Sequence, residues 1–100
     1  MNTNSDFITP HIMNTEMPSS KGTFSILPSG TIIGYPDSTA VTMWHYLVTG
    51  TLVITYTGGS KYFYKKVPFT AVMRMLTANS LGEYINKVIK PNYEFWKASL

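Results

Sequence analysis

The sequence contains no cysteine, which excludes disulfide bonds, thiol catalysis and the usual structural zinc sites. Charged residues occupy only 13% of the 100 positions, about half of the usual quarter, which excludes a highly charged helical rod. No apolar run approaches the roughly 18 residues of a membrane helix, and the N-terminus lacks the basic and apolar stretches of a secretory signal. We therefore expect one small domain with a modest core and no membrane partner.

Groups suited to catalysis or metal binding are also scarce. His11 and His45 are the only histidines, and no carboxylates stand at metal-ligand spacing beside them, so we expect no metal site. Gly58-Gly59 lacks the following helix and the spacing of a phosphate-binding loop and is interpreted as a turn. No paired-carboxylate, Ser-His-Asp or cofactor pattern is present. The sequence therefore predicts no enzyme activity, no catalytic residue and no cofactor.

The few charges present are unevenly distributed. Residues 1–57 hold one lysine against three carboxylates, a net charge of −2, whereas residues 58–100 hold seven basic side chains against two acidic ones, a net charge of +5. A basic segment of this kind is suited to a polyanionic partner, although many such segments are only solvated surface.

Short β-rich runs separated by turn residues fill the first two thirds of the chain after a polar, non-periodic segment at residues 1–22. Pro28-Ser29-Gly30 predicts the turn of a first hairpin. The runs are expected to form about five antiparallel strands, at residues 23–27, 31–35, 40–48, 51–57 and 61–66.

The register of the last hairpin follows from burial, because a one-residue slip would move a whole set of side chains to the other face. A three-residue loop at Gly58-Gly59-Ser60 pairs Tyr56 with Tyr62 and Ile54 with Tyr64. One face then carries the apolar and tyrosine side chains at positions 52, 54, 56, 62 and 64. A two-residue loop would instead move Lys61 and Lys65 onto this apolar face, so the longer loop is preferred.

Two short helices are expected after the strands, both packed on one face of the sheet. Pro68 suits the first turn of a helix, and the next apolar residues recur at helical spacing, at positions 69, 72, 73 and 76. Ser80 and Glu83 have the spacing of a capping box for a second helix, which Pro91 is expected to end. The aromatic residues of the C-terminal tail are expected to dock on the domain. The predicted class is α+β.

Several ordered motifs between residues 38 and 93 resemble the KTSC domain, a short module found at the C-terminus of some lysyl-tRNA synthetases and as a free-standing bacterial and phage protein. Val41 to Tyr46 is similar to the family's opening strand, and Tyr62-Phe63-Tyr64 to its Tyr-x-Tyr motif. The further matches are Val67-Pro68 and the helical residues Ser80, Gly82, Tyr84 and Asn86. The acidic residues usual in the first turn are missing at Leu47 to Gly50.

The resemblance implies a division of the chain and a type of activity. It implies an N-terminal arm and hairpin extension at residues 1–37, a KTSC-like domain at residues 38–93 and an aromatic tail at residues 94–100. The biochemical role of the family is unknown, and its synthetase context suggests RNA binding. We expect a cytoplasmic location, or a virion if a phage encodes the chain.

The first hypothesis is a non-enzymatic module that binds RNA, a nucleotide or another polyanion through the basic half of the chain. Phe63, between two lysines and opposite the tyrosine face, is the expected base-stacking residue unless the N-terminal hairpin or the C-terminal tail covers it. Tyr62 and Tyr64 either stack on bases or lie in the core with their hydroxyls at its rim. The predicted site residues are Lys61, Phe63, Lys65, Lys66, Arg74, Lys87 and Lys90.

Two further hypotheses remain open at this point. One is a phage virion or accessory protein that forms a homo-oligomer or a larger assembly through residues 1–37. The other is a phage counter-defence protein that sequesters a nucleotide signal or blocks a host enzyme. The residues expected to have a structural role in the family motif are Tyr46, Tyr62, Tyr64, Pro68, Ser80, Gly82 and Asn86.

Overall fold

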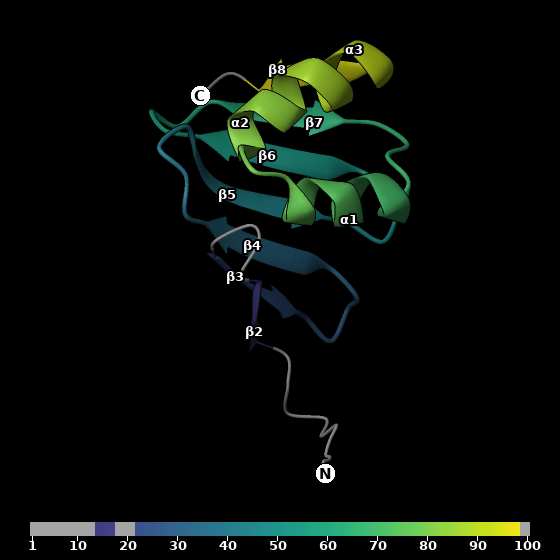
Figure 1. The fold of residues 1–100 in the computed structure, drawn as a ribbon. Helices are drawn as coiled ribbons and strands as arrows, with labels where there is room; N and C mark the ends of the chain where they lie inside the picture. Colours follow the sequence, from purple (N-terminus) through teal and green to yellow (C-terminus); the bar gives the residue numbers. More distant parts are fainter. Residues whose placement is uncertain (1–13, 18–21, 99–100) are drawn as a thin grey trace, which may run out of the picture.

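An antiparallel sheet with helices on one face makes up the described part of the chain (Figure 1), and the predicted α+β class is confirmed. The structure, a computed structural model, describes residues 14–17 and 22–98. The strands are β2 (Asn14–Met17), β3 (Gly22–Ile26), β4 (Ile32–Pro36), β5 (Val41–Tyr46), β6 (Leu52–Tyr56), β7 (Lys61–Tyr64) and β8 (Phe95–Ala98). The helices are α1 (Phe69–Thr77), α2 (Leu81–Tyr84), the π-helix η1 (Ile85–Ile89) and α3 (Lys90–Asn92).

Within the described residues the sheet has seven strands in chain order, β2 to β8, rather than the expected five. The five expected strands are β3 to β7. β2 forms in a segment expected to lack regular structure, and β8 forms in the aromatic tail, where it pairs with β7. Both additions are four-residue strands, too short for their own sequence pattern to reveal them. Residues 1–13 and 18–21 of the expected arm, with His11, lie outside the described residues.

The hairpin between β6 and β7 has the predicted loop length but not the predicted pairing. The Tyr56 N–H donates to the Ser60 carbonyl at 2.8 Å, so the loop is residues 57–59. Ile54 therefore lies opposite Tyr62, and Leu52 opposite Tyr64, which corrects the expected pairs. Gly58 and Gly59 both adopt positive φ, 102° and 100°. Because the register moved by two residues, each side chain keeps its predicted face.

The core lies between β5, β6 and β7 and the helical layer. Trp44, which is 2% exposed, packs across Gly34 of the neighbouring strand, where an added Cβ would lie 2.0 Å from the indole ring. Glycine at this position therefore makes room for the largest side chain of the core. The other core residues are Val41, Leu52, Ile54, Tyr64, Val67, Ala71, Val72, Met75, Leu76, Ile85 and Ile89.

Helix α1 begins one residue after Pro68, which is its N-cap rather than its first residue, and it buries a different stripe from the predicted one. Val72 and Leu76 are buried, whereas Phe69 and Met73 are 51% and 41% exposed. Ala71 and Met75 take the places expected for Phe69 and Met73. The two possible stripes share positions 72 and 76, so periodicity alone does not distinguish them.

The second helical segment is continuous from α2 through η1 to α3. The Ser80 hydroxyl accepts the Glu83 N–H at 3.3 Å, as predicted for its cap, and the Glu83 carboxylate pairs instead with Lys87 at 3.5 Å. Pro91 does not end this segment, contrary to the prediction, because it lies within α3 just after the wider π turn. In that turn the Lys90 N–H donates to the Ile85 carbonyl, five residues back. Among the described helices, none is long and apolar enough to cross a membrane.

Candidate anion-binding pocket

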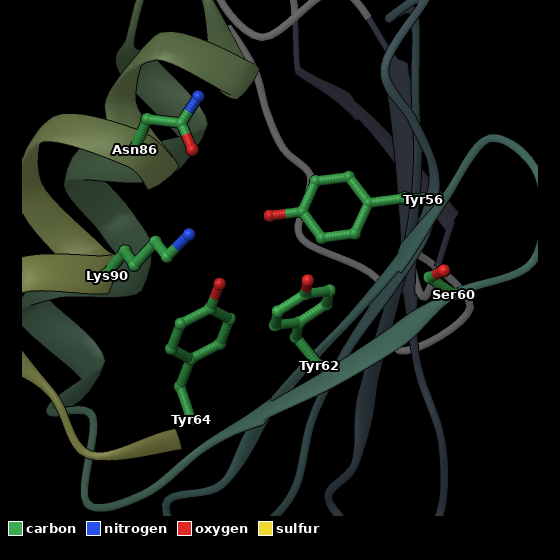
Figure 2. Close-up of a pocket in the computed structure, with 6 residues that line it drawn as sticks. All are labelled: Tyr56, Ser60, Tyr62, Tyr64, Asn86 and Lys90. Atoms are coloured by element: carbon green, nitrogen blue, oxygen red, sulfur yellow. The ribbon is translucent and has the colours of Figure 1, made fainter. Parts of the chain in front are cut away.

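A pocket of about 270 Å³ opens between the sheet and the helical layer (Figure 2). Tyr56 of β6 and Tyr62 and Tyr64 of β7 contribute from the sheet, and Asn86 of η1 and Lys90 of α3 contribute from the helices; Ser60 of the β6–β7 loop also lines it. The alternation of β7 brings Tyr62 and Tyr64 to the helix-covered face together. Asn86 and Lys90 are four residues apart on the π turn and its end, and π turns of this kind occur frequently at functional sites.

The three tyrosine rings pack against one another and fix the sheet side of the pocket. Tyr56 meets Tyr62 edge-on with ring centroids 5.3 Å apart, and Tyr62 stacks on Tyr64 at 6.3 Å. Phe95 of β8 contacts the rings of Tyr62 and Tyr64 at 5.7 and 5.4 Å. These ring contacts leave the hydroxyl ends facing the helical layer, where they converge with the Lys90 ammonium (Figure 2).

The Tyr64 hydroxyl is a buried polar group without a hydrogen bond. Tyr64 is 0% exposed, and its oxygen has no partner of acceptable geometry in the described part of the chain. Burial raises the pKa of Tyr64, and the hydrogen-bonding contact of its hydroxyl with the Tyr56 hydroxyl raises it further, so the Tyr64 hydroxyl stays protonated. A buried donor left unpaired costs about 1–3 kcal/mol, and such a group calls for an explanation.

The charge of the pocket is positive. Lys90 supplies an ammonium group 5.7 Å from the Phe95 ring, and none of the described residues that line the pocket is acidic. Lys90 takes part in neither of the two described ion pairs, which are Lys65–Glu94 and Lys87–Glu83. Lys97 of β8 places a second ammonium 5.9 Å from the Tyr62 ring. This positive charge favours an anion over a cation in the pocket.

Three of the predicted polyanion-binding residues lie on the opposite face of β7 or just beyond it. Phe63 stacks on Trp96 of β8 with centroids 5.0 Å apart and planes 7° apart, so the tail covers Phe63, the alternative left open above. The Lys65 ammonium lies 5.5 Å from the Trp96 ring and 3.9 Å from the Glu94 carboxylate. Lys61 is half-buried on this face. The exposed aromatic ring here is Trp96, which is 44% exposed.

The other predicted basic residues are dispersed. Lys66 follows β7 with a positive φ of 53°, and Arg74 is exposed near the end of α1. Lys87 is engaged with Glu83. Of the seven predicted residues, only Lys90 lines the pocket. Tyr56 and Ser60 are not among the predicted site residues. The sequence pattern already placed Tyr56 on the same face as Tyr62 and Tyr64, which could have indicated its place in the pocket.

The remaining family-motif residues lie at junctions of the fold. The Tyr46 hydroxyl donates to the Val67 carbonyl at 2.7 Å and joins β5 to the start of α1, next to Pro68. Gly82 packs close to Ala40, where an added Cβ would meet the Ala40 Cβ at 3.5 Å. Within residues 14–17 and 22–98, no three His, Asp or Glu side chains are grouped to hold a metal ion.

The fold and the pocket define a small α+β domain in which a helical segment closes over a tyrosine-bearing sheet. The model of the KTSC domain matches residues 37–93, more than half of the chain. The chain belongs to the KTSC domain family, as its resemblance predicts.

Individual relatives agree with this family. An uncharacterized protein of Stutzerimonas stutzeri (strain A1501) is 38% identical over 47 residues, or 46% of this chain, and a protein of Tsukamurella paurometabola is 36% identical over 42 residues, or 42% of this chain. The chain spans only 66% and 63% of the length of these relatives. The crystal structure of a KTSC domain protein from Yersinia pestis matches with a TM-score of 0.62 and 24% identity, over 69% of this chain and 99% of that one. At this identity the likeness shows the fold alone.

Proposed function

We propose that this chain is a non-enzymatic binding module for phosphate-bearing ligands of the nucleic-acid class, and that the tyrosine pocket contacts a phosphate group. The observation that carries the proposal is the unpartnered Tyr64 hydroxyl, buried in a pocket that also holds the Lys90 ammonium. A ligand oxygen that accepts a hydrogen bond from the Tyr64 hydroxyl removes the free-energy cost of leaving this buried group without a regular hydrogen bond.

The polar groups of the pocket favour an anion over a neutral ligand. Three phenolic hydroxyls and one ammonium can all donate, and the Asn86 side chain adds an amide that can donate through its NH₂ group. Burial raises the pKa of Tyr56 as well as that of Tyr64, so both remain donors at neutral pH. Hydrogen bonds to an ionised acceptor are roughly twice as strong as neutral ones.

Aromatic rings beside the pocket support a nucleic acid or nucleotide over a simple inorganic anion. Tyr56 and Tyr62 are only half-buried, and Phe95 is 36% exposed at the β8 edge of the same face. Exposed rings next to cationic groups are the combination that single-strand binding proteins use for bases and phosphates. Lys97, stacked on Tyr62, adds positive charge to this surface.

The direct test measures fluorescence anisotropy of a labelled single-stranded RNA at 50 mM salt with Lys90→Ala and Lys87→Ala. Both changes remove one exposed lysine from the same helical segment, but only Lys90 lines the pocket. We expect Lys90→Ala to weaken binding by about tenfold, or about 1.4 kcal/mol, and Lys87→Ala to change it little. Absence of binding to the wild-type chain, or equal losses in the two variants, would overturn the proposal.

A second candidate function is self-association through the strands that precede the family-matched region. The β3–β4 hairpin exposes apolar side chains, with Ile26 41%, Leu27 38% and Tyr35 53% exposed. Ile26 and Leu27 are adjacent at the turn end of the hairpin, whereas Tyr35 pairs opposite Thr23 toward its other end, and exposed apolar side chains are frequent in protein contact surfaces. The test is the mass of the chain in solution: a dimer or larger species that Ile26→Ser converts to a monomer supports this function, and a wild-type monomer contradicts it.

A further inference from the structure

We infer that the tyrosine pocket selects a terminal phosphate, the monoester at the end of a nucleic acid or nucleotide, over the internal phosphodiesters of a strand. This inference rests on the proposed function and names the ligand group of the same site. It starts from the three tyrosines that line the pocket, of which Tyr64 is fully buried and Tyr56 and Tyr62 are half-buried.

The two walls of the pocket favour a chain end. The tyrosine rings bound the pocket on the sheet side, and Asn86 and Lys90 bound it on the helix side (Figure 2). An internal phosphate carries a sugar on each of two ester oxygens, so both sugars must be accommodated between these walls. A terminal phosphate carries one sugar and presents three free oxygens to the donors.

The number and charge of the donors also match a monoester. Six groups that can donate line the pocket: the hydroxyls of the three tyrosines and of Ser60, the Asn86 amide and the Lys90 ammonium. An internal phosphodiester offers two free oxygens and one negative charge, whereas a phosphate monoester offers three oxygens and a charge near −2 at neutral pH. The ammonium groups of Lys90 and Lys97 supply two positive charges on this face.

The size of the pocket agrees with a phosphate and one adjoining sugar. Its volume of about 270 Å³ far exceeds the roughly 10–15 Å³ of the same kind of volume that one water molecule needs. This space exceeds what a phosphate group fills alone. The half-exposed rings of Tyr56 and Tyr62 lie where the sugar or the first base would leave the pocket.

The test is isothermal titration calorimetry of the full chain with three unlabelled eight-nucleotide RNAs of one sequence at 50 mM salt and pH 7.5. One RNA carries a 5′-phosphate, one a 3′-phosphate, and one has hydroxyls at both ends. We expect at least one phosphorylated RNA to bind at least about tenfold more tightly than the unphosphorylated one, a difference of about 1.4 kcal/mol. Tyr64→Phe should abolish most of this difference, and Tyr35→Phe, which removes a hydroxyl from an exposed tyrosine of β4, should preserve it.

The outcomes separate this inference from the proposed function. Equal affinity for all three RNAs overturns the terminal selectivity and leaves nucleic-acid binding intact. Absence of binding by all three overturns both. A terminal preference that persists in Tyr64→Phe overturns the assignment to this pocket. Circular dichroism of each variant, with a wild-type spectrum and a melting temperature no lower than that of the wild type, ensures that a lost preference reports the hydroxyl rather than unfolding.

Discussion

Tyr64 and Lys90 face the same pocket from the two layers of the domain, Tyr64 from β7 of the sheet and Lys90 from the start of α3 (Figure 2). The tyrosine contributes a buried hydroxyl without a hydrogen bond, and the lysine contributes a positive charge that neither described ion pair uses. A fold that only needed a stable core would gain from phenylalanine at position 64. We propose that a ligand oxygen accepts a hydrogen bond from this hydroxyl.

Replacement of Tyr64 by phenylalanine should separate stability from binding. Because the change removes an unpaired buried hydroxyl, we expect the free energy of unfolding in urea to rise by about 1 kcal/mol, while the affinity for phosphorylated RNA falls. The matched control is Tyr84→Phe, which removes a hydroxyl that donates to the Ala71 carbonyl at 3.3 Å. That variant should lose about 0.5–1.5 kcal/mol. Loss of stability in Tyr64→Phe would mean that the hydroxyl has a structural partner.

The salt dependence of binding should report the phosphate contact of Lys90. For a single strand, each neutralised phosphate contributes a slope of about −0.7 to the logarithm of affinity against the logarithm of salt concentration. Lys90→Ala should therefore reduce the slope by about 0.7, measured by anisotropy between 50 and 200 mM salt. An unchanged slope would show that Lys90 makes no phosphate contact.

Replacement of Trp96 by alanine should loosen the pairing of β8 with β7. The change removes the stack on Phe63 and the ring beneath the Lys65 ammonium. An aromatic pair of this kind contributes about 0.5–1.5 kcal/mol beyond its buried area, so we expect a loss of at least about 1 kcal/mol in urea unfolding. Val48→Ala, at a residue 71% exposed, should change stability by less than about 0.5 kcal/mol. Equal effects would contradict the docking of the tail.

Two glycine-to-alanine substitutions should have opposite effects on stability. In Gly34→Ala the new Cβ would lie 2.0 Å from the buried Trp44 ring, so we expect a loss of at least about 1–3 kcal/mol from overpacking. Gly82 lies in α2, and in Gly82→Ala the new Cβ would lie at an ordinary contact distance of 3.5 Å from the Ala40 Cβ. We expect the free energy of unfolding to rise by about 0.4–1 kcal/mol. Thermal unfolding of both variants tests the prediction, and a neutral Gly34→Ala would contradict the close packing of Trp44.

Acidification should destabilise the fold through His45. Burial lowers the pKa of His45 below its ordinary 6.5, and the nearby Lys61 ammonium lowers it further. The unfolded chain therefore binds the imidazole proton of His45 more readily than the folded chain does. The free energy of unfolding is highest above pH 6.5, where His45 is neutral in both states, and it decreases as the pH falls below 6.5. Urea unfolding at pH 8 and pH 5.5 should show a smaller decrease in His45→Gln than in the wild type. Equal decreases would exclude a role for this histidine.

The face of each sheet residue could be predicted from sequence, but the convergence of the pocket residues could not. The alternation of side chains along each strand predicts that positions 52, 54, 56, 62 and 64 share one face of the sheet. This prediction is correct even though the predicted register is wrong by two residues. The loop position was ambiguous because both Gly58 and Gly59 accept the positive φ that the turn requires.

The helical side of the pocket depends on features that no local pattern reveals. Asn86 lies on the π turn that replaces regular helix at residues 85–89, and Lys90 lies at its end. Trp96 covers Phe63 only because β8 pairs with β7, and β8 has four residues that are mostly exposed. The tail forms a strand because it pairs with β7, and its own sequence pattern does not predict a strand.

The central claim, that the tyrosine pocket binds a phosphate group, is tested most directly by nuclear magnetic resonance. The isotope-labelled chain is titrated with the RNA that carries a 5′-phosphate and with its 3′-phosphorylated counterpart, and the side-chain amide of Asn86 and the ammonium of Lys90 are followed. We expect saturable shifts of both groups at one site per chain, absent in Tyr64→Phe. Shifts confined to Lys61, Phe63 and Trp96 on the opposite face, or no shifts at all, would contradict the account.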